Sequence, residues 1–145
     1  MSLAMTKADR DAFLADVHVG VIGIEQAGAP PLMAPIWYDY APDAGLWVLT
    51  GPDSLKGRAI AAAGRFSLVA QVEEPPAYQY VSVEGPVVST EPADLERDTR
   101  PMARRYFGTE LGDLYVKSQA SDTSVRITMR PETWRTVDYR KLTLA

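Results

Sequence analysis

Two cations stand close together at the start of a predicted helix, in the segment VLTGPDSLKGRAIAAAG (48–64). Ser54 is a typical N-cap residue and a glycine ends the segment, so the sequence predicts a helix over 54–63. The first turn of a helix presents unpaired N–H groups that suit phosphate oxygens. Ser54 would add a hydroxyl, Lys56 an ammonium and Arg58 a two-pronged guanidinium. The spacing is not that of a P-loop, and spacing alone favours an ordinary capped helix with solvated cations.

A second group of candidate residues lies in the predicted strand LMAPIWYDY (32–40). Pro35 cannot donate a ladder hydrogen bond, so it indicates a sheet edge, a bulge or a place where another molecule meets the backbone. Next to Pro35 and Ile36, Trp37 has the size and flatness to stack on or wall off a planar ring. An edge strand with a core tryptophan is the alternative interpretation.

The remaining aromatic and titratable residues give weaker signals. Tyr78 and Tyr80 fall on one face of a predicted strand, where they would line a pocket, form a subunit contact or pack on the neighbouring strand. His18 is the only histidine and has no acid at a recognisable spacing, which favours a structural role. The sequence identifies no catalytic triad, carboxylate dyad or other acid–base residue. An enzyme built on this chain would therefore rely on a cofactor.

Composition bounds the class of protein. The 145 residues, 46% hydrophobic and 23% charged, suit a single globular domain over 1–145. The second methionine, Met5, suggests that residues 1–5 are a disordered leader. A net charge of −4 and a pI of about 5.0 disfavour a nucleic-acid partner. The lack of cysteine, with a single histidine, predicts no metal site. No apolar run reaches the roughly 18 residues of a membrane span, and no signal peptide is evident, so a cytoplasmic protein is expected.

The pattern along the chain predicts a mainly β protein. Connections of hairpin length indicate a six- to seven-stranded antiparallel barrel whose openings are covered by peripheral helices. Helices are expected over 7–16, 54–63, 91–108 with a break at Pro101, and 109–119. Strands are expected over 17–25, 32–40, 46–50, 65–73, 78–88 with a bend at Gly85–Pro86, 124–131 and 132–141.

The order of these segments resembles the pyridoxamine 5′-phosphate oxidase-related family of split β-barrels, which bind flavins or deazaflavins. The resemblance covers nearly the whole chain and is strongest over 35–37 and 50–58, with support from EGPVV (84–88) and RPETWRTVDY (130–139). It implies a homodimer with two cofactor sites at the subunit interface. The residues it implies there are Ser54, Lys56 and Arg58 at the cofactor phosphate, Thr50 at the strand end that feeds this site, Pro35, Ile36 and Trp37 along the ring, Gln71 facing the cofactor, and Tyr78, Tyr80 and Trp134 from the partner subunit.

The resemblance also implies an activity. The expected function is an oxidoreductase that transfers a hydride between its cofactor and an unidentified small molecule. FMN is the first choice of cofactor. The deazaflavin coenzyme F-420 is the alternative, because RFSLVAQVEEPP (65–76) with VSVEGPVV (81–88) is similar to the deazaflavin branch. The longer anionic tail of that coenzyme would need further cations, for which Arg100, Arg104, Arg105 and Lys117 are available.

Three alternatives to pyridoxamine phosphate oxidation stay open. The chain is short for a true pyridoxamine phosphate oxidase and lacks the C-terminal arginine and histidine pattern of that enzyme, so another substrate is expected. A non-catalytic protein that binds or carries a flavin, haem or tetrapyrrole in the same barrel is a second interpretation. A structural dimer with a vestigial site is a third.

Overall fold

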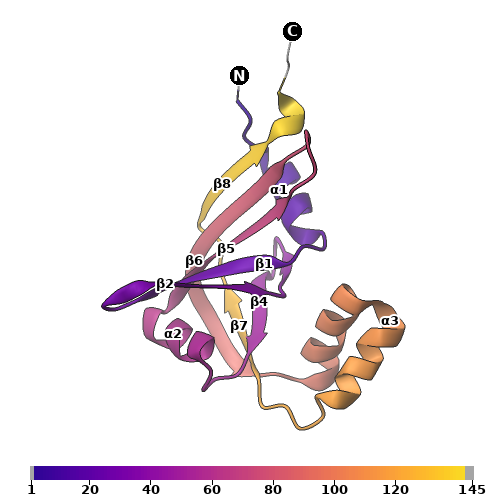
Figure 1. Ribbon diagram of the computed structural model, residues 1–145. Helices are drawn as coiled ribbons and strands as arrows, with labels where there is room; N and C mark the ends of the chain where they lie inside the picture. The colour runs from indigo at the N-terminus through magenta and orange to yellow at the C-terminus, as the bar shows by residue number, and fades with distance from the viewer. Residues whose placement is uncertain (1, 143–145) are drawn as a thin grey trace.

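The computed structural model describes residues 2–142 as an antiparallel sheet with helices at its periphery (Figure 1). The strand order is β2-β1-β5-β6-β7-β4-β3, and β8 pairs with β6 beside this path. The mainly β fold class expected from the sequence is confirmed, with eight strands in place of six or seven. The strands are β1 (Gly20–Gln26), β2 (Ala29–Ile36), β3 (Asp39–Ala41), β4 (Gly45–Thr50), β5 (Arg65–Val72), β6 (Gln79–Pro92), β7 (Val125–Met129) and β8 (Thr133–Asp138); the helices are α1 (Lys7–Ala15), α2 (Leu55–Ala63), η1 (Leu95–Thr99), α3 (Arg100–Ser118) and η2 (Tyr139–Lys141).

The long strand β6 joins the two halves of the sheet. Its first part pairs with β8 over 79–84 and its last part with β7 over 87–92, while β5 pairs with 79–86. The register of β6 against β7 shifts between Val87 and Ser89. This irregularity lies just after the Gly85–Pro86 bend that the sequence predicts.

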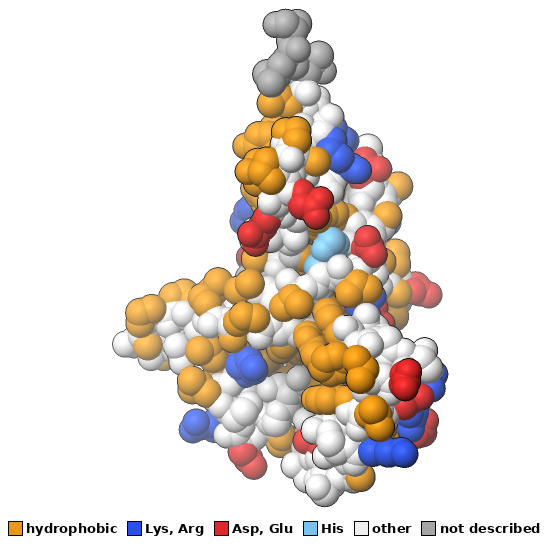
Figure 2. Space-filling view, turned by 45° about the vertical axis from the view of Figure 1, so that its right-hand side comes forward, with side chains coloured by type: hydrophobic (Ala, Val, Ile, Leu, Met, Phe, Trp, Pro, Cys, Tyr) orange, Lys and Arg blue, Asp and Glu red, His pale blue; other side chains and the backbone are white. Residues whose placement is uncertain are grey.

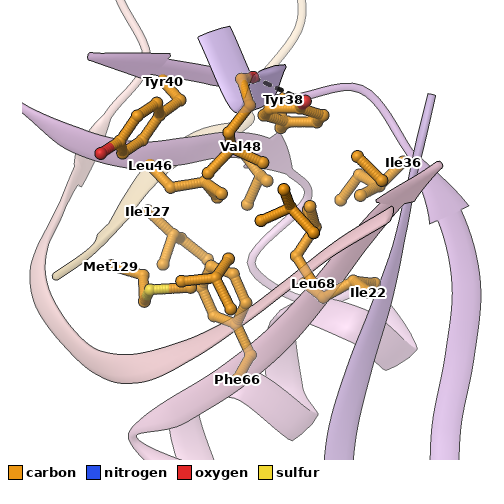
Figure 3. Packing of buried hydrophobic residues seen from close by; sticks show 14 of the residues in the cluster. Ile22, Ile36, Tyr38, Tyr40, Leu46, Val48, Phe66, Leu68, Ile127 and Met129 are labelled. Atoms are coloured by element: carbon orange, nitrogen blue, oxygen red, sulfur yellow. Dashed lines mark hydrogen bonds between the residues drawn. The ribbon is translucent and has the colours of Figure 1, made fainter. Parts of the chain in front are cut away.

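The sheet curls around one hydrophobic core. Ile22 and Leu68, from the neighbouring strands β1 and β5, point toward Val48 and Met129, from the neighbouring strands β4 and β7 (Figure 3). The two pairs of strands lie on opposite sides of β6 in the sheet order. All four side chains are almost fully buried. Burying an aliphatic side chain of this size contributes about 1.5–3 kcal/mol, so this shared interior holds the two ends of the sheet together.

The strand predicted over 32–40 is interrupted. β2 ends at Ile36 and β3 begins at Asp39, at opposite ends of the strand order. Between them, the backbone N–H of Tyr38 donates to the hydroxyl of Tyr106 (3.1 Å), and that hydroxyl donates to the carbonyl of Tyr38 (3.0 Å). A side chain from α3 therefore satisfies both backbone groups in place of a strand neighbour.

The beginning of the chain differs from the disordered leader expected over 1–5. The carbonyl of Leu3 accepts from the N–H of Asp138 (2.8 Å), and the N–H of Met5 donates to the hydroxyl of Thr136 (2.9 Å). The side chain of Met5 is buried in the core. Leu3 and Met5 are thus hydrogen-bonded to β8. Met1 lies outside the described residues.

α3 is a helical hairpin rather than one straight rod (Figure 1). The break falls at Gly108, where a φ of 80° suits glycine and where the sequence predicts one helix to end and the next to begin. The further break predicted at Pro101 is wrong, because Pro101 occupies the first turn of α3. Arg104 and Arg100 on the first arm both pair with Asp113 on the second arm, at 2.8 and 2.7 Å. The hydrogen bonds from Arg104 and Arg100 lower the pKa of Asp113 to about 2. No helix among residues 2–142 has the length and apolar character that crossing a bilayer requires.

Candidate functional site

A cleft of about 340 Å³ opens between the end of β2, the start of α2 and the α3 hairpin. Its volume lies within the usual range of small-molecule sites. Four of the residues singled out in the sequence line it: two at the end of β2, Trp37 directly after that strand, and one in the first turn of α2. The full lining is Val19, Pro35, Ile36, Trp37, Leu49, Lys56, Thr99, Met102, Ala103, Tyr115, Gln119, Asp122 and Ser124.

Trp37 belongs to an aromatic cluster at the wall of this cleft. Its ring stacks on Tyr106 with centroids 5.0 Å apart and planes 6° from parallel. Phe107 meets it edge-on at 5.0 Å, and Tyr115 lies tilted at 5.6 Å. The ring of Trp37 is thereby fixed in orientation by three partners. Figure 2 shows hydrophobic side chains gathered on this face of the molecule. Val19 of the cleft lining and Phe107, Leu111 and Leu114 of α3 are exposed hydrophobic residues.

Pro35 lies on an edge strand, which is one of the three positions that the sequence predicts for it. β2 is the outermost strand at its end of the sheet, and within it Pro35 faces Val21 of β1. Proline, which has no N–H to donate, is found in sheets mainly on such edge strands. The last two residues of this edge strand, Pro35 and Ile36, line the cleft.

The N-terminus of α2 is built as the sequence predicts. The hydroxyl of Ser54 accepts from the N–H of Gly57 (3.0 Å) and donates to the carbonyl of Gly51 (2.6 Å). Gly57 must be glycine, because a Cβ there would overlap the carbonyl oxygen of Gly51. The first turn is thus pressed against the turn that follows β4, and Ser54 acts as the helix cap. The N–H groups of Leu55 and Lys56 have no acceptor within the helix.

Lys56 and Arg58 are directed to different surfaces. Lys56 lines the cleft, whereas Arg58 lines a separate groove between α2 and the turn that joins β1 to β2. Residues two positions apart on a helix do not share a face, which explains the separation. Neither cation makes an ion pair with another residue of the 2–142 range. The structure therefore does not bring the two predicted phosphate ligands together within one chain.

The other predicted cofactor residues lie outside the cleft lining. Thr50 is buried, with its hydroxyl 3.2 Å from that of Ser54. Gln71 is exposed on β5 and donates to Glu73 (2.7 Å). Both side chains therefore have protein partners of their own.

The three residues predicted to contact a partner subunit differ in exposure. Tyr78, which directly precedes β6, is 44% exposed and meets Tyr139 edge-on. Tyr80 within the strand is 38% exposed. Trp134 is half-buried and packs inside its own chain, beneath the guanidinium of Arg10 and beside Tyr40.

Most of the cations suggested for a longer anionic tail are engaged elsewhere. Arg100 and Arg104 pair with Asp113, and Arg100 also pairs with Glu96. Arg105 is held by backbone carbonyls near the end of α1. Within the described part of the chain, Lys117 alone of the four makes no ion pair.

A buried carboxylate, Asp98, lies in η1 directly before α3 and fixes the start of that helix. Asp98 is fully buried and pairs with Arg97 (2.7 Å) and Arg126 (2.8 Å). Burial opposes its ionisation, but hydrogen bonds from Arg97, the backbone of Asp94 and Arg126 outweigh burial and lower the pKa to about 2. This pairing ties η1 to β7 and positions Thr99, which lines the cleft.

His18 has the structural role that the sequence favours. Its Nε2 lies 2.9 Å from the carbonyl oxygen of Phe13, and its ring stacks on that of Phe13 at 4.4 Å. Burial lowers its pKa. It does not line the cleft.

Sequence reasoning missed the α3 side of the site. Met102, Ala103 and Tyr115 line the cleft from both arms of the hairpin, and Asp122 and Ser124 close it from the following loop. Only the fold-back at Gly108 brings these segments beside β2. The one available signal was the glycine after RRYF, which marks the end of a helical arm.

Comparisons with known proteins identify the fold. A sequence model described as pyridoxamine 5′-phosphate oxidase matches residues 7–138. A conserved hypothetical protein of Mycobacterium tuberculosis superposes with a TM-score of 0.79 and 22% identity, covering 99% of this chain and 91% of that one. An F-420 reductase gives 0.60 and 16%, covering 86% and 94%. A FAD-binding protein from Mesorhizobium loti gives 0.64 and 17%, covering 93% and 96%. A search of curated proteins gives no match.

Proposed function

The chain belongs to the pyridoxamine 5′-phosphate oxidase family, and from this premise we propose that it binds a flavin-type cofactor in the cleft between β2, α2 and α3. One observation carries the proposal. Lys56, a cation without an ion-pair partner in residues 2–142, lines the same cleft as the fixed ring of Trp37. An anionic group joined to a flat ring matches that combination. The similarity to an F-420 reductase and a FAD-binding protein adds support for the ligand class.

The cleft residues fit such a cofactor in two parts. Lys56 and the free N–H groups at the start of α2 would hold the phosphate. Pro35, Ile36 and Trp37 would lie along the ring. In this proposal Ser54 holds the helix end in place and Arg58 lies outside the cleft, so neither is a phosphate ligand from the same chain.

We propose that the protein is an oxidoreductase acting on a small molecule. The bound cofactor would supply a ring that accepts or donates a hydride. The apolar side chains of the cleft would exclude water from that ring. Among the lining residues only Lys56, Tyr115 and Asp122 carry groups able to exchange a proton, which agrees with chemistry left mainly to the cofactor.

FMN remains the first choice and coenzyme F-420 the alternative. The longer tail of F-420 carries further negative charges, yet Arg100, Arg104 and Arg105 are occupied by other groups of the chain. Lys117 is then the one cation of the suggested set left for the tail. This distribution of charge favours the shorter, singly phosphorylated cofactor.

We further propose a homodimer with two cofactor sites at its interface, each built from both subunits. Tyr78 and Tyr80 support it as exposed aromatic side chains that a partner subunit would cover. Trp134 is the weaker candidate for such a contact, because it is packed within its own chain.

Titration of the purified protein with FMN and, separately, with coenzyme F-420 tests the proposal. Saturable quenching of FMN fluorescence, with weaker binding of F-420, is the expected result. Tight F-420 binding without FMN binding would reverse the choice of cofactor, and binding of neither would refute the site. A bound cofactor that neither NAD(P)H nor a chemical hydride donor reduces would indicate a non-catalytic carrier.

A further inference from the structure

The α3 hairpin forms one wall of the cleft but does not share the main core. Its buried side chains Met102, Ala103 and Val116 do not belong to the hydrophobic core cluster that the sheet encloses within residues 2–142. The position of this wall therefore depends on contacts outside that core.

Arg105 attaches the hairpin to the end of α1. Its guanidinium donates to the carbonyls of Ala15 (2.9 Å) and Asp16 (2.7 Å) and lies 3.2 Å from the carboxylate of Asp39. The last carbonyls of a helix lack partners within it, and a cation is favourable at that negative end. The Arg105 side chain is only 12% exposed, so solvent screens these contacts weakly.

Tyr106 attaches the hairpin to the segment beside the cleft. Its hydroxyl shares its one proton between the carbonyl oxygens of His18 (2.6 Å) and Tyr38 (3.0 Å), and accepts from the N–H of Tyr38 (3.1 Å). Its ring stacks face to face on Trp37. One side chain thus fixes both the backbone after Trp37 and the indole ring itself.

Neither Arg105 nor Tyr106 lines the cleft, whereas Trp37 does. We infer that Arg105 and Tyr106 form a latch that positions Trp37 and the α3 wall, and thereby sets the affinity of the cleft for a flat ring. The inference rests on the proposed function for its ligand. Both latch residues are positioning residues, because they act through Trp37 and the backbone and do not touch the cleft interior.

Replacement of Tyr106 by phenylalanine separates the two contacts. Tyr106→Phe removes the hydroxyl and keeps the stacked ring, while Tyr106→Leu removes both. Tyr139→Phe is a matched control, because its hydroxyl makes no hydrogen bond within residues 2–142. Each variant is titrated with FMN, its thermal midpoint is recorded, and amide hydrogen exchange over residues 100–118 is measured without ligand.

The latch predicts that Tyr106→Phe weakens FMN binding about fivefold, as expected for the loss of one net hydrogen bond. It also predicts faster exchange over 100–118, a larger effect of Tyr106→Leu on both readouts, and none of Tyr139→Phe. Unchanged FMN affinity in Tyr106→Phe would overturn the inference, as would unchanged exchange. If the wild-type protein binds neither FMN nor F-420, the proposed function fails, and the exchange measurement still decides whether Tyr106 holds the hairpin.

Discussion

Replacement of Lys56 by glutamine tests the phosphate-binding part of the site. Lys56 is half-buried, lines the cleft and makes no ion pair with the rest of residues 2–142. Glutamine keeps a long side chain and a similar helix propensity while removing the charge. The substitution should therefore leave α2 intact and weaken the attraction for an anionic group.

The magnitude follows from the exposure of the side chain. A hydrogen bond to a charged group contributes about 1.5–3 kcal/mol. Because Lys56 is partly exposed, the lower end applies, and about 1.5 kcal/mol corresponds to a roughly tenfold higher Kd for FMN. The effect should shrink as salt is raised, since solvent reaches the ammonium.

Arg58→Gln provides the control on the same helix. It removes the same charge from α2, but Arg58 lines a different groove. Isothermal titration calorimetry with FMN at two salt concentrations should give a tenfold loss for Lys56→Gln and less than a twofold loss for Arg58→Gln. Equal losses, or a larger loss for Arg58→Gln, would refute the assignment of the phosphate to the cleft.

Two further changes test the elements that position the site. Gly57→Ala should destabilise the protein by about 1–3 kcal/mol despite the better helix propensity of alanine, because its Cβ overlaps the carbonyl of Gly51. Urea denaturation measures this change in the free energy of unfolding. A variant as stable as the wild type would contradict the close packing of α2 on the preceding turn. The ion pairs of Asp98 should make the stability of the protein sensitive to acid. The folded-state pKa of Asp98 is about 2, below the usual unfolded value of about 3.9. The stability that ionised Asp98 contributes is therefore complete above about pH 4 and declines as the pH falls through 2. Asp98→Asn should lower the free energy of unfolding at pH 7 by roughly 3 kcal/mol and flatten its dependence on pH between 4 and 2; an unchanged pH profile would show that Asp98 is not the responsible group.

Local chemistry made part of this structure predictable. Ser54 caps α2 and Gly64 ends it with a φ of 69°, as their residue types indicate. The alternation in β5, where Phe66, Leu68 and Ala70 are buried, likewise follows from a sheet with one face on the core. Signals of this kind depend on neighbours within a few residues.

Contacts between segments that are distant along the chain could not be predicted from the sequence. The break between β2 and β3 depends on the Tyr106 hydroxyl, 68 residues after Tyr38. The α3 wall depends on the fold-back at Gly108. By contrast, the separation of Lys56 from Arg58 was foreseeable, because the spacing of two residues on a helix already turns them apart.

The most direct test of the central claim is the indole N–H spectrum of the protein during an FMN titration. The three tryptophans are Trp37 in the cleft wall, Trp47 buried beneath Arg126, and Trp134 beside Tyr40. A ring bound in the cleft should shift the Trp37 resonance strongly and leave Trp47 in place. Saturation of the protein with FMN while the Trp37 resonance stays unmoved would contradict the proposed site.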